Sequence, residues 1–178
     1  MTILNSTISG NEAVCLGPCI GGGIANVGKM AILNSTVSMN SPDAIGTYSN
    51  PQGPDVPYLE MANTLIDGGC DEFLGDALEP QTTWVSDGYG IESPGDTCGF
   101  DQLTDQVDIP DPMLGPLKDN GGSSETHALL PGSPAIDQIP EAECLDADGQ
   151  PLMTDQRGEP RPAGAEFRCD VGAFEVQP

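Results

Sequence analysis

The hydrophobic and polar positions in the first third of the chain repeat every 29 residues. The segment 3–9, with the sequence ILNSTIS, returns at 32–38 as ILNSTVS, and a weaker copy, MANTLID, occupies 61–67. An apolar residue also stands two positions before each copy, so every unit alternates apolar and other residues up to an Asn. Such alternation predicts a short β-strand, and a period of this length is typical of solenoids built from stacked repeats.

Each unit changes phase at its Asn. Met30 and Ile32 share one face of an extended strand, whereas Val37 has the opposite parity. All of them reach the same core only if the chain turns a corner near Asn34. Stacked units then place Asn5, Asn34 and Asn63 in one column, where their side-chain amides bond to each other and to the backbone at the bend. The pattern predicts a parallel β-helix with an asparagine column at one corner.

Glycine and proline restrict the remaining secondary structure. The longest stretch without either residue spans 29–41 and is rich in Ser, Thr and Val, which favour strands and turns over helix. We therefore expect an all-β protein, with β-helix coils over residues 1–69 and an irregular, loop-rich capping module over residues 70–178. A Pro-rich excursion separates two coils between Tyr48 and Tyr58. Five aromatic residues are expected to cover the last coil: Trp84, Tyr89, Phe100, Phe167 and Phe174.

The charge of the chain excludes some classes of partner. Acidic residues outnumber basic ones by 28 to 5, which gives a net charge of −23. Nucleic acid and anionic lipid surfaces are bound through clustered Lys and Arg, which this sequence does not have. No window reaches the roughly 18 consecutive apolar residues of a membrane-spanning helix. We expect neither nucleic-acid binding nor direct insertion into a membrane.

Several motifs, taken in order, resemble the C-terminal part of choice-of-anchor Q domain proteins, which are bacterial right-handed parallel β-helix proteins of the cell surface. The motifs are NSTISGN (5–11), GGGIAN (21–26), DPMLGPLKDNGG (111–122), THALLPGSPAID (126–137), TDQRGEPRP (154–162) and CDVGAFE (169–175). The resemblance implies an extracellular or cell-surface right-handed β-helix that ends in the capping module and leads to an anchor. On this interpretation upstream coils, a signal sequence and the anchor lie outside the chain, and its first coil presents open strand edges that invite pairing with another chain.

The six cysteines fit an oxidising compartment. Their spacings contain no paired CxxC clusters of the kind that hold metal ions, so disulfides are favoured. Six cysteines allow 15 pairings. Proximity along the chain together with the resemblance favours Cys15 with Cys19, Cys70 with Cys98, and Cys144 with Cys169. The alternative is that the cysteines are reduced and buried as small apolar residues.

The sequence offers little that would support catalysis. Carbohydrate-active β-helices need converging carboxylates on one strand face, or a calcium site beside a basic residue, and neither pattern is found. Arg157 and Arg161 are interpreted as structural partners of Asp155, Glu159 or Asp170, with substrate binding as the alternative. The single histidine, His127, has no Ser or Cys partner motif, so we expect a hydrogen-bonded role in the core. We predict no catalytic residue and no required cofactor.

Two further motifs have a structural and a functional interpretation. Asp146 and Asp148, followed by Gly149, begin like a calcium loop, but the twelfth position, which should be a bidentate Glu, is Arg157. A solvated acidic turn is the alternative to calcium binding. Asn5 and Asn34 both begin an Asn-Ser-Thr glycosylation pattern, although an amide that points into the corner is not accessible to modification.

Together these features predict a non-enzymatic structural or adhesive protein outside the cytoplasm. Its partner would be a cell-surface or extracellular glycan or protein. One alternative is a polysaccharide-binding or pectate-lyase-like β-helix, which would show a row of exposed aromatic residues or a carboxylate cluster. Another is a filament subunit that associates through open coil ends.

Overall fold

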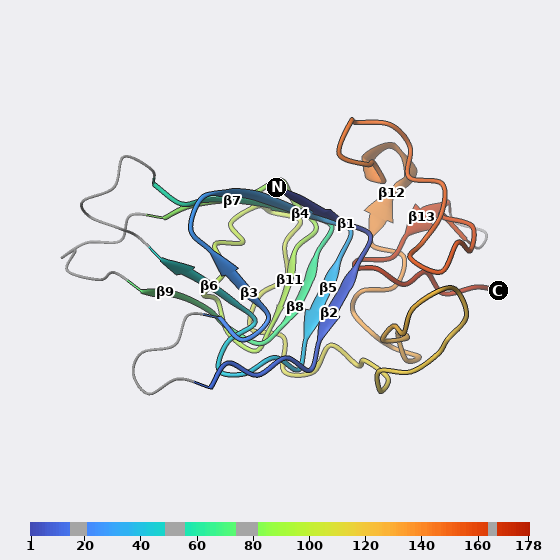
Figure 1. Cartoon of the computed structure of the whole chain (residues 1–178). Coiled ribbons are helices and arrows are strands. Elements are labelled where there is room, and N and C mark those ends of the chain that lie inside the picture. Colours follow the sequence, from blue (N-terminus) through green and yellow to red (C-terminus); the bar gives the residue numbers. More distant parts are fainter. Residues whose placement is uncertain (15–20, 49–55, 74–81, 164–166) are drawn as a thin grey trace.

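The strands follow one another in a fixed cycle around three parallel sheets (Figure 1). The computed structural model describes residues 1–14, 21–48, 56–73, 82–163 and 167–178. We call each pass through the sheets a rung. The strands of the first rung are β1 (Thr2–Leu4), β2 (Thr7–Ser9) and β3 (Ile24–Asn26). Those of the second are β4 (Lys29–Leu33), β5 (Thr36–Ser38) and β6 (Ile45–Tyr48). Those of the third are β7 (Tyr58–Ala62), β8 (Leu65–Asp67) and β9 (Cys70–Phe73), and the fourth contains β10 (Thr83–Ser86) and β11 (Ile91–Ser93).

Successive rungs are paired in the register that the sequence repeat requires. The sheets have the orders β1-β4-β7-β10, β2-β5-β8-β11 and β3-β6-β9. Ile3 lies opposite Ile32, which in turn lies opposite Met61. The 29-residue period is therefore the length of one rung, and the prediction of an all-β protein with parallel strands is confirmed.

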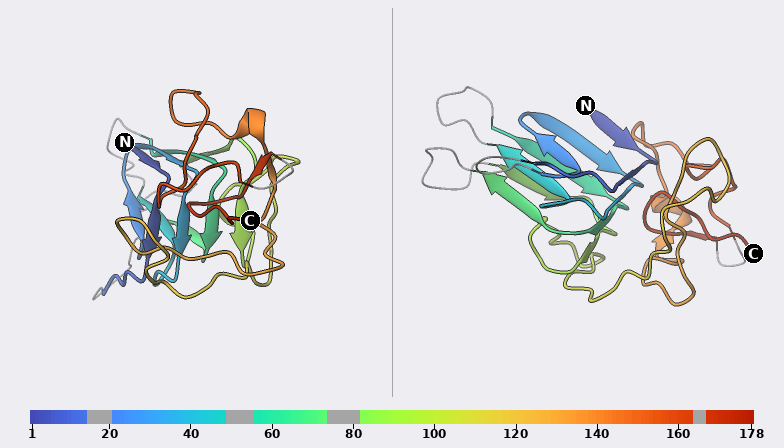
Figure 2. Two further views of the ribbon diagram at one scale, coloured as in Figure 1. Left: turned by 90° about the vertical axis from the view of Figure 1, so that its right-hand side faces the viewer. Right: turned by 60° about the horizontal axis from the view of Figure 1, so that its bottom comes forward.

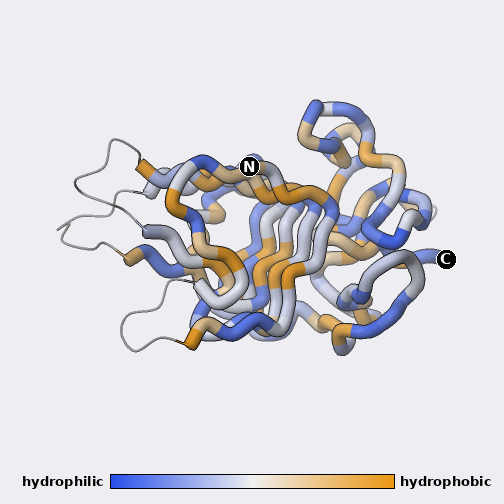
Figure 3. The backbone as a smooth tube through the Cα atoms, in the orientation of Figure 1, coloured by the Kyte–Doolittle hydropathy of each residue, from blue (hydrophilic) through white to orange (hydrophobic). Residues whose placement is uncertain are grey.

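The apolar positions of the repeat form the core between the three sheets. Ile32, Val37, Met61 and Ile66 are fully buried and belong to one cluster. Figure 3 shows hydrophobic positions recurring at matching places on successive rungs. Each inward side chain packs on the equivalent side chain of the next rung, so burial comes from stacking and not from any single repeat.

The stack of rungs extends well past residue 69, where we expected the coils to end. Strands β9, β10 and β11 continue the three sheets, and Gln106 pairs in parallel with Ile91 beyond them. The reason is that backbone pairing continues without the Asn motif, with Trp84 opposite the buried Leu59 and Glu92 opposite the buried Ile66. The Pro-rich excursion after Tyr48 lies largely outside the described residues.

The last rung is covered by the loop that follows β11. Phe100 is buried in the core cluster, and its ring lies so close to Gly90 that a Cβ there would be 2.3 Å from a ring carbon. Trp84 is partly buried against the same cluster. Phe100 thus covers the last rung as predicted, whereas Trp84 belongs to that rung, on β10. The other three do not cover it, because Tyr89 and Phe174 join a second cluster and Phe167 is 65% exposed.

Residues 111–178, which we call the C-terminal segment, lie beside the stack of rungs and do not close its end (Figure 2). The segment contains β12 (Ile139–Pro140), the 3-10 helix η1 (Glu141–Glu143) and β13 (Arg168–Cys169), and β12 pairs antiparallel with β13. Its apolar side chains form the second cluster with Leu65 and Ile91, which project from the outer face of the sheet β2-β5-β8-β11. The expected capping module is thus a lateral support, because it finds its apolar partners on that outer face.

Among the described residues, no helix is long and apolar enough to cross a bilayer.

Candidate functional site

The seam between the rungs and the C-terminal segment runs along the asparagine corner. Asn5, Asn34 and Asn63 have φ values of 51°, 49° and 54°, the left-handed conformation that Asn adopts more readily than most residues. Their backbone N–H groups donate to the next rung, for example Asn34 to Ala62 O at 3.0 Å. The predicted corner column is confirmed, since Asn63 Nδ2 also donates to Asn34 Oδ1 at 3.2 Å.

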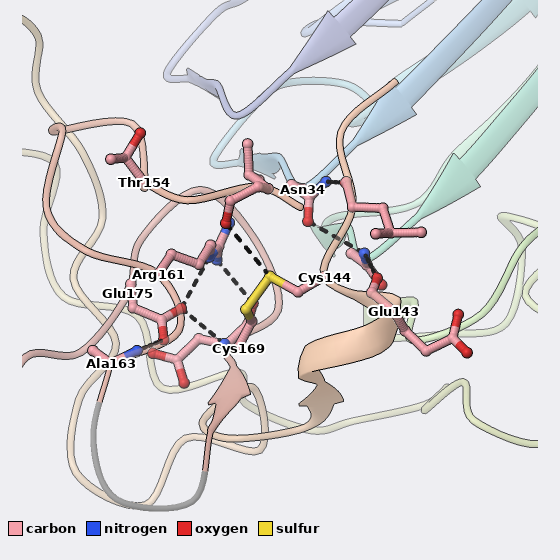
Figure 4. The surroundings of a disulfide bond; sticks show 12 residues. Asn34, Glu143, Cys144, Thr154, Arg161, Ala163, Cys169 and Glu175 are labelled. Carbon is pink, nitrogen blue, oxygen red and sulfur yellow. Dashed lines mark hydrogen bonds and ion pairs between the residues drawn. A yellow bond between two sulfur atoms is a disulfide. The ribbon is translucent and has the colours of Figure 1, made fainter. Parts of the chain in front are cut away.

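The sequence led us to expect that the amides of this column point into the coil. They point outward instead. Asn34 Nδ2 donates to Leu145 O at 2.8 Å, and Asn63 Nδ2 donates to Glu143 O at 3.0 Å. Asn5 Nδ2 donates to Thr154 O at 3.1 Å. The inside of the corner is filled by apolar residues, so the amides turn outward and meet the C-terminal segment, whose carbonyls they satisfy (Figure 4). Asn34 is 1% exposed because that segment covers it.

A second row of polar contacts joins the same segment to the outer face of β2 and β5. Thr7 Oγ1 donates to Gln156 Oε1 at 2.7 Å, and Ala173 N donates to Thr36 Oγ1 at 3.1 Å. Gly172 has a φ of +99° and approaches so closely that a Cβ there would lie 2.6 Å from Thr36 Oγ1. The backbone of the segment therefore lies directly on the sheet, at a position where only glycine fits without strain.

His127 takes part in this row through a serine that the sequence did not single out. Its Nε2 lies 2.8 Å from Ser9 Oγ, and its Nδ1 lies 2.7 Å from Gly115 O. The carbonyl can only accept, so Nδ1 carries a proton; in the neutral imidazole Nε2 then accepts the hydrogen bond of the Ser9 hydroxyl. The imidazole is 2% exposed and both its nitrogens are engaged, which fits the predicted hydrogen-bonded role in the core. Ser9 and His127 are 118 residues apart, and no local motif connects them.

Buried ion pairs hold the turns of the C-terminal segment together. Arg157 binds Asp155 at 2.7 Å, as predicted, and its guanidinium lies 3.6 Å above the ring of Phe174. Arg161 binds Glu175 at 2.9 Å instead of one of the three carboxylates that we expected. Glu175 was missed because it lies 14 residues away along the chain, beyond the motif that contains the arginine.

Asp170 lies in the same network without an ion pair. Its Oδ1 and Oδ2 accept hydrogen bonds from Asp137 N and Val176 N, and Arg161 Nη2 donates to its main-chain oxygen. Burial raises the pKa of its carboxyl to about 6, and the nearby charge of Glu175 also raises it. The hydrogen bonds from the two backbone amides and the charge of the Arg161 guanidinium lower it, but by less. The Asp170 carboxyl therefore gains a proton at a higher pH than an ordinary aspartate does.

Two disulfides are described, and both have the predicted partners. Cys70 is bonded to Cys98 and joins β9 to the loop that covers the last rung. Cys144 is bonded to Cys169 and joins the end of η1 to β13, directly below the asparagine corner (Figure 4). The expected pair of Cys15 and Cys19 lies outside the described residues.

A groove of about 280 Å³ opens beside the corner, between the outer face of β7 and the loop 143–149. Its acidic members include Glu60 and Asp87, which come from neighbouring rungs. A hydrogen bond between these two carboxyls, followed by burial, raises the pKa of Glu60, while the hydroxyl of Tyr58 lowers it.

The calcium candidates Asp146 and Asp148 form the tip of a tight turn. Asp146 Oδ1 accepts the N–H groups of Asp148 and Gln150, each at 2.9 Å, and Leu145 pairs antiparallel with Pro151. Within the described ranges no group of three or more acidic, His or Cys side chains is placed to hold a metal ion. In this conformation the Asp146 side chain stabilises the turn that places Leu145 O at Asn34, and Asp148 takes part through its backbone.

Glu92 is a further structural residue that the sequence analysis missed. It occupies an inward position on β11, opposite Ile66, and is fully buried. Its carboxylate accepts hydrogen bonds from the N–H and hydroxyl of Thr97 and from Cys98 N, at distances from 2.7 to 2.9 Å. Glu92 therefore ends the row of inward apolar residues formed by Ile8, Val37 and Ile66, and it holds the loop that covers the last rung. Alternation of polarity in β11 could have revealed it, because Glu stands where the repeat has an apolar residue.

No protein-family model matches the chain, and comparisons with curated proteins and with solved structures likewise gave no match.

Proposed function

We propose that this chain is a non-enzymatic part of a right-handed parallel β-helix protein that acts outside the cytoplasm as a structural or adhesive element. Three parallel sheets visited in a fixed cycle support the β-helix, and connections between parallel strands are right-handed in nearly all proteins. The motifs that resemble choice-of-anchor Q domain proteins support the same architecture. The function of the C-terminal segment is to fasten successive rungs from the side.

The observation that carries this proposal is that the buried charged side chains of the C-terminal segment make internal contacts. The guanidinium of Arg161 is buried between Glu175 and two main-chain oxygens, and that of Arg157 is held by Asp155 and Glu175 O. The carboxylates accept backbone N–H groups as well. Apart from Arg161 Nη1, which is buried without a hydrogen-bond partner in the described structure, these groups are satisfied internally. Groups satisfied in this way stabilise a loop-rich fold and are unsuited to binding a substrate.

Extracellular location is supported by the two disulfides. Cys144–Cys169 and Cys70–Cys98 each join segments more than 20 residues apart, and such bonds persist in oxidising compartments. The direct test is cell fractionation with an antibody against the chain, combined with alkylation of free thiols before reduction. We expect the native product in the surface or secreted fraction without thiols at the four cysteines. A cytoplasmic product with free thiols would contradict the proposal.

A second candidate function, binding of a polysaccharide, is favoured by the groove beside the asparagine corner. Paired carboxyls and the ring of Tyr89 line it, a combination that suits hydroxyl groups and one sugar face. The acidic lining disfavours anionic polysaccharides. The carboxyls of Glu60 and Asp87 both line the groove and can accept hydrogen bonds from sugar hydroxyls.

Calorimetry with neutral oligosaccharides separates this candidate from the structural role. Binding should weaken at least tenfold in Tyr89→Ala and Glu60→Gln, and remain in Asp148→Asn, whose side chain lies outside the groove lining. Absence of heat with gluco-, manno- and galacto-oligosaccharides alike would remove glycan binding in this groove. Release of reducing ends would overturn the non-enzymatic proposal itself.

A further inference from the structure

The asparagine column ends one rung before the stack of rungs ends. Asn63 Nδ2 donates to Asn34 Oδ1 at 3.2 Å and to Glu143 O at 3.0 Å. The fourth rung has Gly88 at the equivalent place, and its backbone oxygen accepts the N–H of Asn63 at 3.0 Å. Because glycine has no side-chain amide, the column stops there, and no described residue donates a hydrogen bond to Asn63 Oδ1.

The free oxygen of Asn63 is accessible from the groove beside the corner. Asn63 is 5% exposed and lines this groove. Among the described residues, the sealed side-chain atoms without a hydrogen-bond partner are Asn5 Oδ1 and Arg161 Nη1, so Asn63 Oδ1 keeps contact with open space. A polar group that is nearly buried and still lacks a partner is a place where a bound molecule can supply the missing hydrogen bond.

The charged side chains of the groove are acceptors as well. Glu60 on β7 and Asp87 after β10 project from the same outer face on neighbouring rungs, and Asp146 lies on the facing loop. Asp87 raises the pKa of Glu60 through a hydrogen bond, and burial and the charge of Asp87 add to this effect. Among the described residues, no Lys or Arg lines the groove, so its carboxyls have no basic partner there.

The side-chain amides that line the groove are already engaged as donors. Asn34 Nδ2 donates to Leu145 O, and Asn63 Nδ2 donates to Glu143 O. A ligand that complements the groove must therefore donate hydrogen bonds and carry positive charge, because ionised carboxyls only accept. A sugar hydroxyl donates one hydrogen bond and leaves the charges in place, whereas an ammonium group donates three and neutralises one charge.

We propose that the groove binds a polysaccharide that carries free amino groups, with the ammonium group of one hexosamine unit held by Glu60, Asp87 and Asn63 Oδ1. This inference rests on the second candidate function, binding of a polysaccharide, and names its ligand class. The sugar ring lies against the aromatic ring of Tyr89, which suits the apolar face of a sugar. A polymer is favoured over a single amine because the net charge of −23 attracts the further ammonium groups along the polymer.

Isothermal titration calorimetry on the full chain tests this ligand class. The probe is a glucosamine hexasaccharide, compared with the N-acetylated hexasaccharide of the same linkage and with a neutral gluco-hexasaccharide. At about pH 6, between the ordinary pKa values of carboxyls and amines, we expect the glucosamine form to bind at least about tenfold more tightly than either. This preference should shrink when NaCl is raised from about 0.05 M to about 0.5 M, because salt screens the charges.

Variants that remove single acceptors locate the amino group. Glu60→Gln and Asp87→Asn keep the size of the side chain and remove its charge, so the ratio of affinities for the glucosamine and N-acetylated forms should fall towards one. Asn63→Gly removes the free oxygen, keeps the backbone with φ 54° without strain, and should lower the same ratio. Asp148→Asn, the matched control, removes a charge from an exposed residue outside the groove lining and should leave the ratio unchanged. Unchanged circular dichroism of the variants establishes that loss of the preference is not loss of the fold.

Other outcomes overturn the proposal. Equal affinities for the three hexasaccharides refute the need for an amino group, while polysaccharide binding stands. If none of the three binds, polysaccharide binding in this groove is refuted together with this inference, and the structural role, which cell fractionation tests, is unaffected. A hexalysine peptide that binds as tightly and responds to the same variants shows that the groove serves a basic protein. An equal loss of preference in Asp148→Asn shows attraction by overall charge and not by the groove.

Discussion

Replacement of Asn34 should separate the two contributions of the asparagine corner. The side chain makes one hydrogen bond across the seam, to Leu145 O at 2.8 Å, and one along the asparagine column, from Asn63 Nδ2 at 3.2 Å. At a net value of about 0.5–1.5 kcal/mol each, their loss in Asn34→Gly should cost about 1–3 kcal/mol of unfolding free energy. Glycine keeps the left-handed backbone with φ 49° without strain.

Asn34→Ala removes the same hydrogen bonds and adds backbone strain. A residue with a Cβ in the left-handed region costs about 1–2 kcal/mol, which is partly offset by the lower entropy of alanine in the unfolded chain. Alanine should therefore be less stable than glycine by about 1 kcal/mol. Asn5→Gly is the matched comparison, since Asn5 donates to Thr154 O alone and its Oδ1 has no partner in the described structure.

Urea denaturation followed by circular dichroism measures these differences. We expect the order wild type, Asn5→Gly, Asn34→Gly and Asn34→Ala from most to least stable, with unchanged m-values. The reasoning is refuted if Asn34→Gly is as stable as wild type, because the seam hydrogen bonds would then contribute nothing. Equal stability of the alanine and glycine variants would refute the strain at the corner.

Three other predictions concern the C-terminal segment and the covered end. Because the pKa of Asp170 is raised to about 6, the native state holds a proton that the unfolded state releases near pH 4. This group should therefore lower the unfolding free energy by up to about 3 kcal/mol as the pH rises from 4 to 7. Asp170→Asn should flatten this dependence of the unfolding free energy on pH, measured by urea titrations, and an unchanged slope would contradict the prediction. Replacing Cys144 and Cys169 together by Ala should cost about 2–5 kcal/mol, measured by thermal unfolding against wild type with and without reductant, and equal melting temperatures would disprove the role of this bond. Phe100→Ala should cost about 3–5 kcal/mol, whereas the exposed Phe167→Ala should stay within about 0.5 kcal/mol, and similar losses in both would show that Phe100 does not cover the last rung.

The sequence was sufficient for those features that repeat at fixed spacing. The 29-residue period and the change of parity at Asn34 predicted the parallel strands, their register and the corner, because stacked rungs require equivalent residues at equivalent places. The pairing of Arg157 with Asp155 was accessible because both lie in one tight turn.

The sequence was insufficient where contacts join distant, non-repeating segments. The seam depends on pairs such as Ser9 with His127 and Thr36 with Ala173, which are separated by 118 and 137 residues. The position of the C-terminal segment beside the rungs follows from Leu65 and Ile91 on the outer face of their sheet, where the first two rungs carry Thr7 and Thr36. The exchange from polar to apolar at these outward positions was visible in the sequence, and it is the signal that would have indicated lateral packing.

Lateral attachment of the C-terminal segment is the central claim, and NMR of the full chain tests it most directly. We expect nuclear Overhauser contacts between Thr36 and Ala173 and between Thr7 and Gln156, which tie the segment to the first two rungs within one molecule. Contacts from the segment to residues 91–109 alone, with none to β2 or β5, would show an end cap and contradict this account.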